Sequence, residues 1–508
     1  MKKIYLFITL VATVLLNSCD MDLAPIGTLD DESAIESVTD LKKARNGIYN
    51  NLRYFVTGPY MYYTDIQMDQ FMGLTINGNQ NGSFAHGNIL SGNSEIEDVW
   101  ASCYGYIANA NYLLKHADAL VAKGNLDGDE LLEVKRYVAE TKFARAYYYA
   151  YLVDHWCVPY TAAAANAQAS GVPLVTVFNP TGDIETYPGR STLAESYALI
   201  DQDLEDAYTD LKEFETATNY DMQPMSAYIN SNTVIALQAR LALLRQDWTT
   251  AINKANQLIN SGVYTLANTN NYDNLWANDT SNELIFRPYS INTELGVYST
   301  GGAYISSTPT QAYYIPTFEN LLLYDDGDVR FDSFFNVRGL LIEGSQEPAY
   351  CFNKYPGNIE LRTGTGTNNL MHMGKPFRLS ETYLILAEAA NEAGDPTTAN
   401  AALNTLRKNR IIGYTETSYS DIELVQEIRD ERSRELIGEG FRFSDLRRWG
   451  LGFVRDSSYP INPQLENAFV VVDTQVEYIA GDHRYTWPIP TTEMENNPQL
   501  KGQQNPGY

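Results

Sequence analysis

The sequence predicts an all-α dominated protein whose scaffold consists of tetratricopeptide-like helix pairs. Apolar residues recur at helical spacing along several long stretches. Two stretches, residues 235–259 and 380–410, resemble helix pairs of about 34 residues with alanines at packing positions. Long irregular segments separate these helical regions. Segments of that length inside a compact protein usually carry function or form a subdomain.

The helical pattern covers four regions, about residues 38–55, 95–155, 192–262 and 374–438. Their local signals predict where individual helices begin and end. Asp247 is a predicted N-cap before Trp248, and Asp395 is another, directly after the terminating Gly394. Ser420 and Glu423 have the spacing of a capping box.

Three irregular regions complete the chain, about residues 56–94, 264–373 and 440–508, and residues 159–190 interrupt the helices as well. The short acidic run 125–130 has some character of a calcium loop but lacks the full EF-hand spacing. We expect it to be a turn that connects two helices.

Residues 1–18 look like a lipoprotein signal peptide. Lys2 and Lys3 precede an apolar run of about 13 residues, too short to cross a bilayer, which needs about 20. The run ends in Leu-Asn-Ser-Cys, which is similar to the lipobox whose cysteine receives a diacylglyceryl group. We expect a bacterial mature chain that begins at Cys19 and is held to a membrane only by its lipid. Residues 19–37, acidic and proline-containing, would be the tether.

The 508-residue chain has a formal net charge of −27, and loss of Lys2 and Lys3 with the signal peptide would leave −29. Such a surface repels phosphate backbones, so we expect no nucleic-acid partner. It also disfavours a polyanionic ligand, although a local basic pocket is compatible with it. The histidines and cysteines lack metal-ligand spacing, and Cys103 and Cys157 lie in apolar helical surroundings typical of buried free thiols. We predict no cofactor, and a structural calcium ion stays an open question.

Charged residues concentrate near position 440 and resemble a catalytic cluster at first sight. Glu431 and Glu435 lie one helical turn apart, however, and arginines follow in the next loop. Bidentate arginine–carboxylate pairs would lock that loop to the helix, so we interpret the cluster as structural. Its members are Glu431, Arg434, Glu435, Arg442, Asp445, Arg448 and Trp449.

Three runs carry a resemblance to a known family. They are KPFRLSETYLILAEAANEAGD (375–395), ERSRELIGEGFRFSDLRRWG (431–450) and WPIPTTEMENNPQLKGQQNPGY (487–508). Together they strongly resemble SusD/RagB proteins, the outer-membrane lipoproteins of Bacteroidetes nutrient-uptake systems. Upstream helices fit as well, so the resemblance covers essentially the whole mature chain, with residues 38–508 as one SusD-like domain.

The resemblance implies a fold and a role. Tetratricopeptide-like helices would pack against an irregular, loop-rich lobe with a few short strands. The protein would capture glycan outside the cell and pass it to a SusC-like TonB-dependent transporter, over which it sits as a hinged lid. Members of the family are not enzymes, and the protein would be lipid-anchored in the outer membrane, facing the extracellular side.

The resemblance also indicates where ligand would bind. A sugar ring has an apolar face and a rim of hydroxyls, which aromatic and polar side chains complement. Family members place such residues in the loops that match residues 65–93 and 289–314 of this chain. Neither stretch contains tryptophan, which favours a smaller ligand or another glycan over a broad starch-like platform. The candidates are Asp65, Phe71, Asn79, Asn81, Phe84, His86, Tyr289, Tyr298, Tyr304 and Tyr313.

Three alternatives stay open on the sequence. A peptide-binding, RagB-like member of the family would need few aromatic platforms. A surface glycosidase would need two carboxylates flanking one bond, which spacing alone does not exclude among 63 acidic residues. A pure helical-repeat scaffold would bind no small ligand.

Overall fold

The computed structural model describes residues 34–75, 78, 80–294, 298–363, 368–455, 457–469 and 476–508. The predicted signal peptide, Cys19 and most of the predicted tether lie outside these residues, as does Asn79. Among the described residues, no helix is both long enough and apolar enough to cross a membrane.

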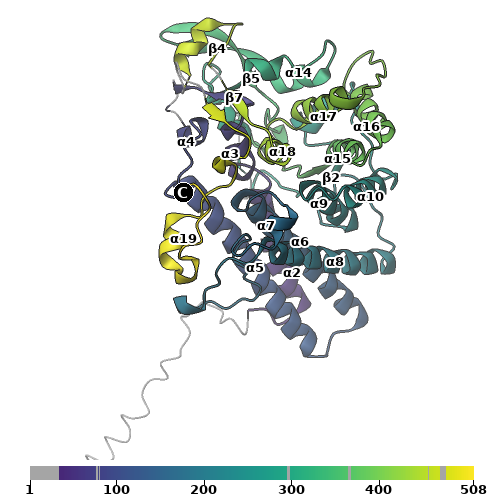
Figure 1. Cartoon of the computed structure of the whole chain (residues 1–508). Helices are drawn as coiled ribbons and strands as arrows, with labels where there is room; N and C mark the ends of the chain where they lie inside the picture. The colour runs from purple at the N-terminus through teal and green to yellow at the C-terminus, as the bar shows by residue number, and fades with distance from the viewer. Residues whose placement is uncertain are drawn as a thin grey trace, which may run out of the picture.

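Helices dominate the fold, as predicted, and they stack in chain order (Figure 1). Each packs on the next through α5, α6, α8, α9 and α10, after which α10 packs on α15, and α15 packs on both α16 and α17. The long helices are α2 (Val38–Phe55), α5 (Ser94–Ala122), α6 (Gly128–Trp156), α8 (Leu193–Ala217), α9 (Ser231–Leu244), α10 (Trp248–Ile259), α15 (Leu379–Glu392), α16 (Pro396–Lys408) and α17 (Asp421–Leu436).

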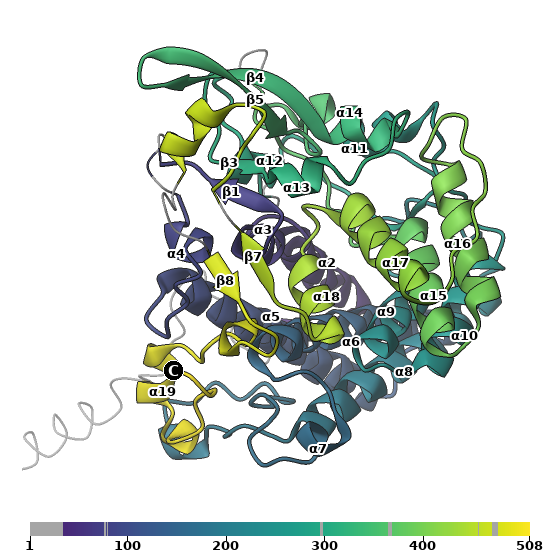
Figure 2. The ribbon, with the colours of Figure 1, turned by 45° about the horizontal axis from the view of Figure 1, so that its top comes forward.

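Most short strands and helices form the second part of the molecule, beside the stacked helices (Figure 2), whereas the β2–β6 pair contacts α9 and α15. Each sheet is a two-stranded antiparallel pair, and the β4–β5 hairpin is the longest. The pairs are β1 (Phe71–Gly73) with β3 (Tyr314–Pro316), β2 (Leu284–Phe286) with β6 (Phe377–Arg378), β4 (Phe335–Ile342) with β5 (Ser345–Phe352), and β7 (Phe453–Arg455) with β8 (Val476–Tyr478). The short helices are α3 (Pro59–Gln67), α4 (Gly82–Ala85), α7 (Ala162–Ala165), α11 (Tyr272–Ala277), α12 (Gly301–Tyr304), α13 (Phe318–Leu321), α14 (Val329–Phe334), α18 (Arg442–Trp449) and α19 (Thr491–Asn496).

Most predicted helix boundaries agree with the structure. Asp247 and Asp395 each cap the following helix through a side-chain oxygen, and Asp127 caps α6 in the turn that has calcium-loop character. The capping box at Ser420 is wrong, because its side chain makes no capping bond. The main-chain oxygen of Ser420 instead accepts the bond from the Glu423 N–H, at 3.1 Å.

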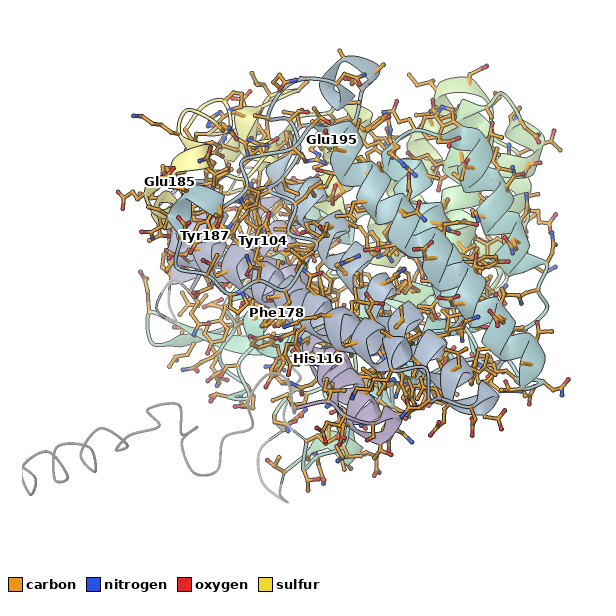
Figure 3. All side chains as sticks on the ribbon, turned by 90° about the horizontal axis from the view of Figure 1, so that it is seen from below. Tyr104, His116, Phe178, Glu185, Tyr187 and Glu195 are labelled. Atoms are coloured by element: carbon orange, nitrogen blue, oxygen red, sulfur yellow. The ribbon has the colours of Figure 1, made fainter. Side chains whose placement is uncertain are left out.

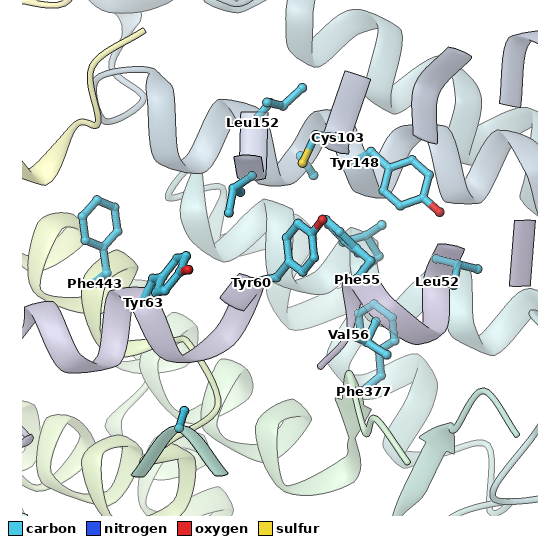
Figure 4. Packing of buried hydrophobic residues seen from close by; sticks show 14 of the residues in the cluster. Leu52, Phe55, Val56, Tyr60, Tyr63, Cys103, Tyr148, Leu152, Phe377 and Phe443 are labelled. Atoms are coloured by element: carbon cyan, nitrogen blue, oxygen red, sulfur yellow. The ribbon is translucent and has the colours of Figure 1, made fainter. Parts of the chain in front are cut away.

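Aromatic side chains fill the core where α2, α3 and α6 meet (Figure 4). The Phe55 ring packs edge-on against Tyr148, with ring centroids 4.8 Å apart, and lies 5.0 Å from Tyr60. Such pairs stabilise a core by about 0.5–1.5 kcal/mol beyond the burial of their area. This core fixes the end of α2 against the start of α3, and both segments contribute to the candidate site.

The irregular segment between α6 and α8 is tied to the helices by side chains that bond its main chain. The Tyr104 hydroxyl donates to the carbonyl oxygen of Pro173 at 2.9 Å, and the Asn111 amide donates to that of Val175 at 2.8 Å. Phe178 packs against Tyr112 farther along the segment (Figure 3). The two hydrogen bonds provide partners for main-chain carbonyl groups that lie outside the helices and strands.

Candidate functional site

The two stretches predicted to bind ligand are adjacent in the structure, although residues 94–288 lie between them in the sequence. Strand β1 from the first pairs with β3 from the second. The Tyr314 hydroxyl donates to the main-chain oxygen of Gln80, and the Tyr304 hydroxyl donates to a carboxylate oxygen of Asp65 at 3.4 Å. Antiparallel pairing and these bonds join both loops into one region.

Four predicted ligand-contact residues belong to the core of that region. Asp65, Phe71, Phe84 and Tyr304 are each 0% exposed. Phe71 lies 4.7 Å from Tyr304, ring to ring, and Phe84 stacks on Tyr63 at 4.6 Å. In this structure these four side chains therefore offer no accessible surface to a ligand. Loops that connect short strands place some of their residues in the core. The sequence pattern does not distinguish these buried positions from the exposed ones.

The other described candidates reach the surface. Tyr289 is 52% exposed and Tyr298 is 39% exposed, and both stand among the exposed large apolar side chains of the protein. His86 is exposed at the end of α4, while Asn81 and Tyr313 are half-buried. These residues are the part of the prediction that a ligand could contact.

Tyr298 belongs to a group that also contains three tyrosines that were not predicted to contact ligand. Its ring lies 5.1 Å from Tyr54 at the end of α2, in an edge-on arrangement. Tyr106 of α5 and Tyr62 of α3 lie near enough to Tyr298 for it to add to the rise in the pKa of each, and Tyr62 also shares a side-chain hydrogen bond with Asn81. Tyr54, Tyr62 and Tyr106 are half-buried, so each keeps accessible surface. We call Tyr54, Tyr62, Asn81, Tyr106 and Tyr298 the tyrosine face.

Gly58 allows Tyr298 to lie where it does. Gly58 has a φ of 67°, in the left-handed region, and an added Cβ would lie 2.4 Å from the Cβ of Tyr298. The Gly58 N–H donates to the Thr300 hydroxyl at 2.8 Å, and the Tyr298 N–H donates to the Thr57 hydroxyl at 3.1 Å. The turn between α2 and α3 therefore positions the most exposed ring of the tyrosine face.

The hydroxyls of Tyr62, Tyr106 and Tyr298 remain protonated at neutral pH. Burial raises the pKa of Tyr62, Tyr106 and Tyr298, and the nearby carboxylate of Asp98 adds to the effect at Tyr298. A protonated phenol both donates and accepts hydrogen bonds. The face thus combines apolar ring surface with groups that match sugar hydroxyls. Burial, together with the nearby charge of Arg455, also lowers the pKa of His86, so that imidazole stays neutral to a lower pH than usual.

Tyr289 lies beside arginines at the other end of the same segment. The Arg53 guanidinium donates to the Tyr289 carbonyl oxygen at 3.1 Å and to the Glu294 carboxylate at 2.6 Å. The guanidinium carbon of Arg287 lies 5.9 Å from the centroid of the Tyr289 ring. The side chain of Asn292 donates to the main-chain oxygen of Arg362 at 3.3 Å. Tyr289 is therefore an exposed ring in more basic surroundings than Tyr298.

The charged residues near position 440 form a buried ion-pair cluster. Glu435 accepts hydrogen bonds from Arg330, Arg378 and Arg410 at 2.9–3.1 Å, and all four side chains are buried. Burial alone would raise the pKa of Glu435, but the three guanidinium groups hold it well below its usual range. Glu431 pairs with Arg330 and Arg434, and its pKa falls to about 2 for the same reason.

The partners of this cluster differ in part from those the sequence predicted. The arginines from the following loop were expected beside Glu431 and Glu435, but Arg442 opens α18 and pairs with Asp69 instead. Asp445 pairs with Arg432 and with Arg448. The glutamate that joins the remaining residues is Glu388 of α15, which pairs with Arg448 and accepts from the indole N–H of Trp449.

Possible metal ligands are scattered in the described part of the chain. It contains no group of three or more His, Cys, Asp or Glu side chains arranged to hold a metal ion. Cys103, Cys157 and Cys351 are free and buried, as expected for Cys103 and Cys157. Burial raises the pKa of the Cys157 thiol to about 11, so it is unreactive at neutral pH.

Comparison with known proteins identifies the family. The model described as "SusD family" matches residues 344–508, and the model described as "Starch-binding associating with outer membrane" matches residues 23–243. The chain belongs to the SusD/RagB family. SusD family proteins are non-catalytic binding proteins, which removes the glycosidase alternative.

Relatives match along their whole length. SusD-like protein P25 of Formosa agariphila is 23% identical, with 95% of each chain covered, and SusD-like protein P2 of the same organism is 24% identical, with 100% of each covered. A SusD superfamily protein from Bacteroides thetaiotaomicron superposes with a TM-score of 0.75 at 26% identity, covering 92% of this chain and 100% of that one. A structure titled "Laminarin binding SusD-like protein" shares the fold, with a TM-score of 0.68 at 22% identity, covering 93% of this chain and 100% of its own.

Proposed function

We propose that this protein is a cell-surface lipoprotein that binds glycan and delivers it to a SusC-like TonB-dependent transporter in the outer membrane. The observation that carries the proposal is the tyrosine face. It assembles exposed or half-exposed rings from α2, α3, α5 and the segment before α12 beside the amide of Asn81. Rings flanked by hydroxyls and an amide match the two kinds of surface on a sugar.

The family supports the same assignment. One matching model carries the description "Starch-binding associating with outer membrane", and one solved structure of the same fold is titled a laminarin-binding protein. The tyrosine face contains no tryptophan, so its ring area is smaller than that of an indole platform. We therefore expect a short stretch of glycan to be bound rather than a long polymer surface.

Attachment to the membrane would depend on Cys19. Residues 16–19 read Leu-Asn-Ser-Cys, and residues 20–37 would separate the lipid from α2, which begins at Val38. Ile35 packs in the core, so the free tether would be residues 20–34, which span up to about 50 Å when extended. The binding lobe would then be free to close over a transporter partner.

Binding to an array that carries both glycans and peptides tests the proposal. The probe is the mature chain from residue 20 onward, which includes every residue that the structure describes. We expect saturable binding to one glycan class, and loss of that binding in the Tyr298→Ala variant. Tyr414→Ala is the matched control, since Tyr414 is a half-buried tyrosine on the loop after α16.

Binding to peptides alone would contradict the glycan assignment and favour the peptide-binding branch of the family. Binding to neither class would contradict capture by the isolated protein. Delivery is tested separately in the source bacterium, where we expect deletion of the chain to abolish uptake of the labelled glycan identified on the array.

A further inference from the structure

Arg287 differs from most buried arginines of this protein in having no carboxylate partner among the described residues. Its side chain is half-buried, and one of its N–H groups donates to the main-chain oxygen of Asp279 at 2.6 Å. Asp279 attracts it electrostatically, but that carboxylate is already paired with Lys375 at 2.5 Å. The Nε–H of Arg287 is buried and has no hydrogen-bond partner among the described residues.

Elsewhere the chain pairs its buried guanidinium groups with acids. A guanidinium taken out of water without a counter-charge costs free energy, so pairing is the expected solution. One buried exception, Arg455, donates to several main-chain oxygens instead. The buried arginines paired with carboxylates include Arg45, Arg145, Arg330, Arg378, Arg410, Arg432 and Arg448.

Arg362 repeats the pattern in the segment that the side chain of Asn292 contacts. Its main-chain oxygen is bonded to Asn292, and its half-buried side chain has no hydrogen bond or ion pair within the described residues. The neighbouring stretches 295–297 and 364–367 contain no Asp or Glu in the sequence. They therefore hold no acid that could neutralise these two arginines.

The position of Arg287 connects this charge to the candidate site. Its guanidinium carbon lies 5.9 Å from the centroid of the Tyr289 ring, which is 52% exposed. Tyr289 in turn is held by Arg53, the neighbour of Tyr54 in the tyrosine face. Arg53 is neutralised by Glu294, so it adds little net charge. The acidic groups Glu95 and Asp98 influence the opposite end, around Tyr62 and Tyr298.

We propose that the glycan bound by this protein carries an oxyanion, either a uronate carboxylate or a sulfate ester, and that Arg287 and Arg362 receive it beside Tyr289. This inference rests on the proposed function and specifies the substrate class of the same site. Binding of a glycan oxyanion beside Tyr289 is compatible with the protein's net charge of −27, because salt screens the more distant acidic groups of the surface over about 10 Å.

The experiment compares pairs of oligosaccharides that differ only in charge. One pair is a short oligogalacturonate and its fully methyl-esterified form, and the second is a sulfated galactan oligosaccharide and its desulfated form. Neutral glucans complete the set. Affinity of the mature chain is measured by calorimetry at low and high salt. We expect one acidic form to bind about tenfold more tightly than its neutral form, as one charge-assisted hydrogen bond would provide.

Arg287→Gln should remove this preference and its salt dependence, while Arg287→Lys should keep part of both. The matched control is Arg338→Gln, because Arg338 also lacks a carboxylate partner among the described residues and donates to one main-chain oxygen, that of Ser306, at 3.0 Å. The Arg338→Gln variant should prefer the acidic oligosaccharide as strongly as the wild type does.

The outcomes separate this inference from the proposed function. Tighter binding of neutral glycans, or an acidic preference that survives Arg287→Gln, would overturn the oxyanion site and leave glycan binding intact. Absence of binding to every oligosaccharide would overturn the proposed function and the inference together. The two acidic pairs show whether the site takes a carboxylate or a sulfate.

Discussion

Replacing Glu435 with Gln should strongly destabilise the protein, because this carboxylate is one of the acids that pair with three arginines that have almost no access to water. Arg330, Arg378 and Arg410 are at most 2% exposed, and Glu435 is 0% exposed. Glutamine keeps the shape of the side chain, but removes the negative charge and replaces an acceptor oxygen with a donor. The substitution therefore isolates the electrostatic contribution.

The magnitude follows from the bonds in the structure. Glu435 accepts four guanidinium N–H bonds, two of them from Arg410. A hydrogen bond to a charged group contributes about 1.5–3 kcal/mol and a neutral one about 0.5–1.5, so each bond loses about 1 kcal/mol. The expected loss is therefore about 3–5 kcal/mol, which is also the usual cost of breaking a buried ion pair on one side.

Denaturant unfolding, followed by tryptophan fluorescence and far-UV circular dichroism, measures this loss. Glu423→Gln is the control, since Glu423 lies exposed on the same helix and should change stability by less than about 0.5 kcal/mol. If Glu435→Gln unfolded at the same denaturant midpoint as Glu423→Gln, the electrostatic account of the cluster would be refuted.

Three further predictions concern the candidate region. Burial raises the pKa of Asp65 to about 8, so the folded state binds the proton more tightly than the unfolded state and stability falls as pH rises from about 4 to about 8. Asp65→Asn should remove that fall. The test compares the denaturant midpoints of the wild type and the variant at pH 5 and pH 8.5. An equal change in midpoint between the two pH values in both proteins would contradict the prediction. Gly58→Ala should destabilise the protein by more than about 1 kcal/mol and weaken glycan binding, because the φ of Gly58 is 67° and the new Cβ would clash with Tyr298. The control is Gly47→Ala on α2, where the new Cβ meets open space and should stabilise the protein by about 0.5–1 kcal/mol. Cys19→Ala should move the protein from the detergent phase to the aqueous phase in membrane partitioning, and unchanged partitioning would contradict lipidation at Cys19.

Much of the helical scaffold could be predicted from the sequence, because periodic apolar residues and local caps determine it. Asp247 and Asp395 cap their helices as predicted, since an N-cap depends on residues within one turn. The helices α3 and α18 were not predicted. Both lie in irregular regions, and α18 is stabilised by distant partners such as Asp69 and Glu388.

The candidate site could be predicted only in outline. The resemblance located the two loops, and the structure shows that they pair through β1 and β3. It could not separate Phe71, which is buried, from Tyr298, which is exposed, because both are aromatic residues in loops. Tyr54 and Tyr106 were missed, since each lies in a helix whose pattern indicated only packing. Their place in the tyrosine face depends on contacts between segments that lie far apart in the sequence.

The most direct test of glycan capture is calorimetric titration of the Tyr298→Ala variant with the glycan found on the array. Loss of ring stacking should weaken binding by about tenfold, the equivalent of about 1.4 kcal/mol, while the denaturant midpoint stays near that of the wild type. Tyr414→Ala should bind like the wild type. Unchanged affinity in Tyr298→Ala would contradict the assignment of the tyrosine face as the glycan-binding surface.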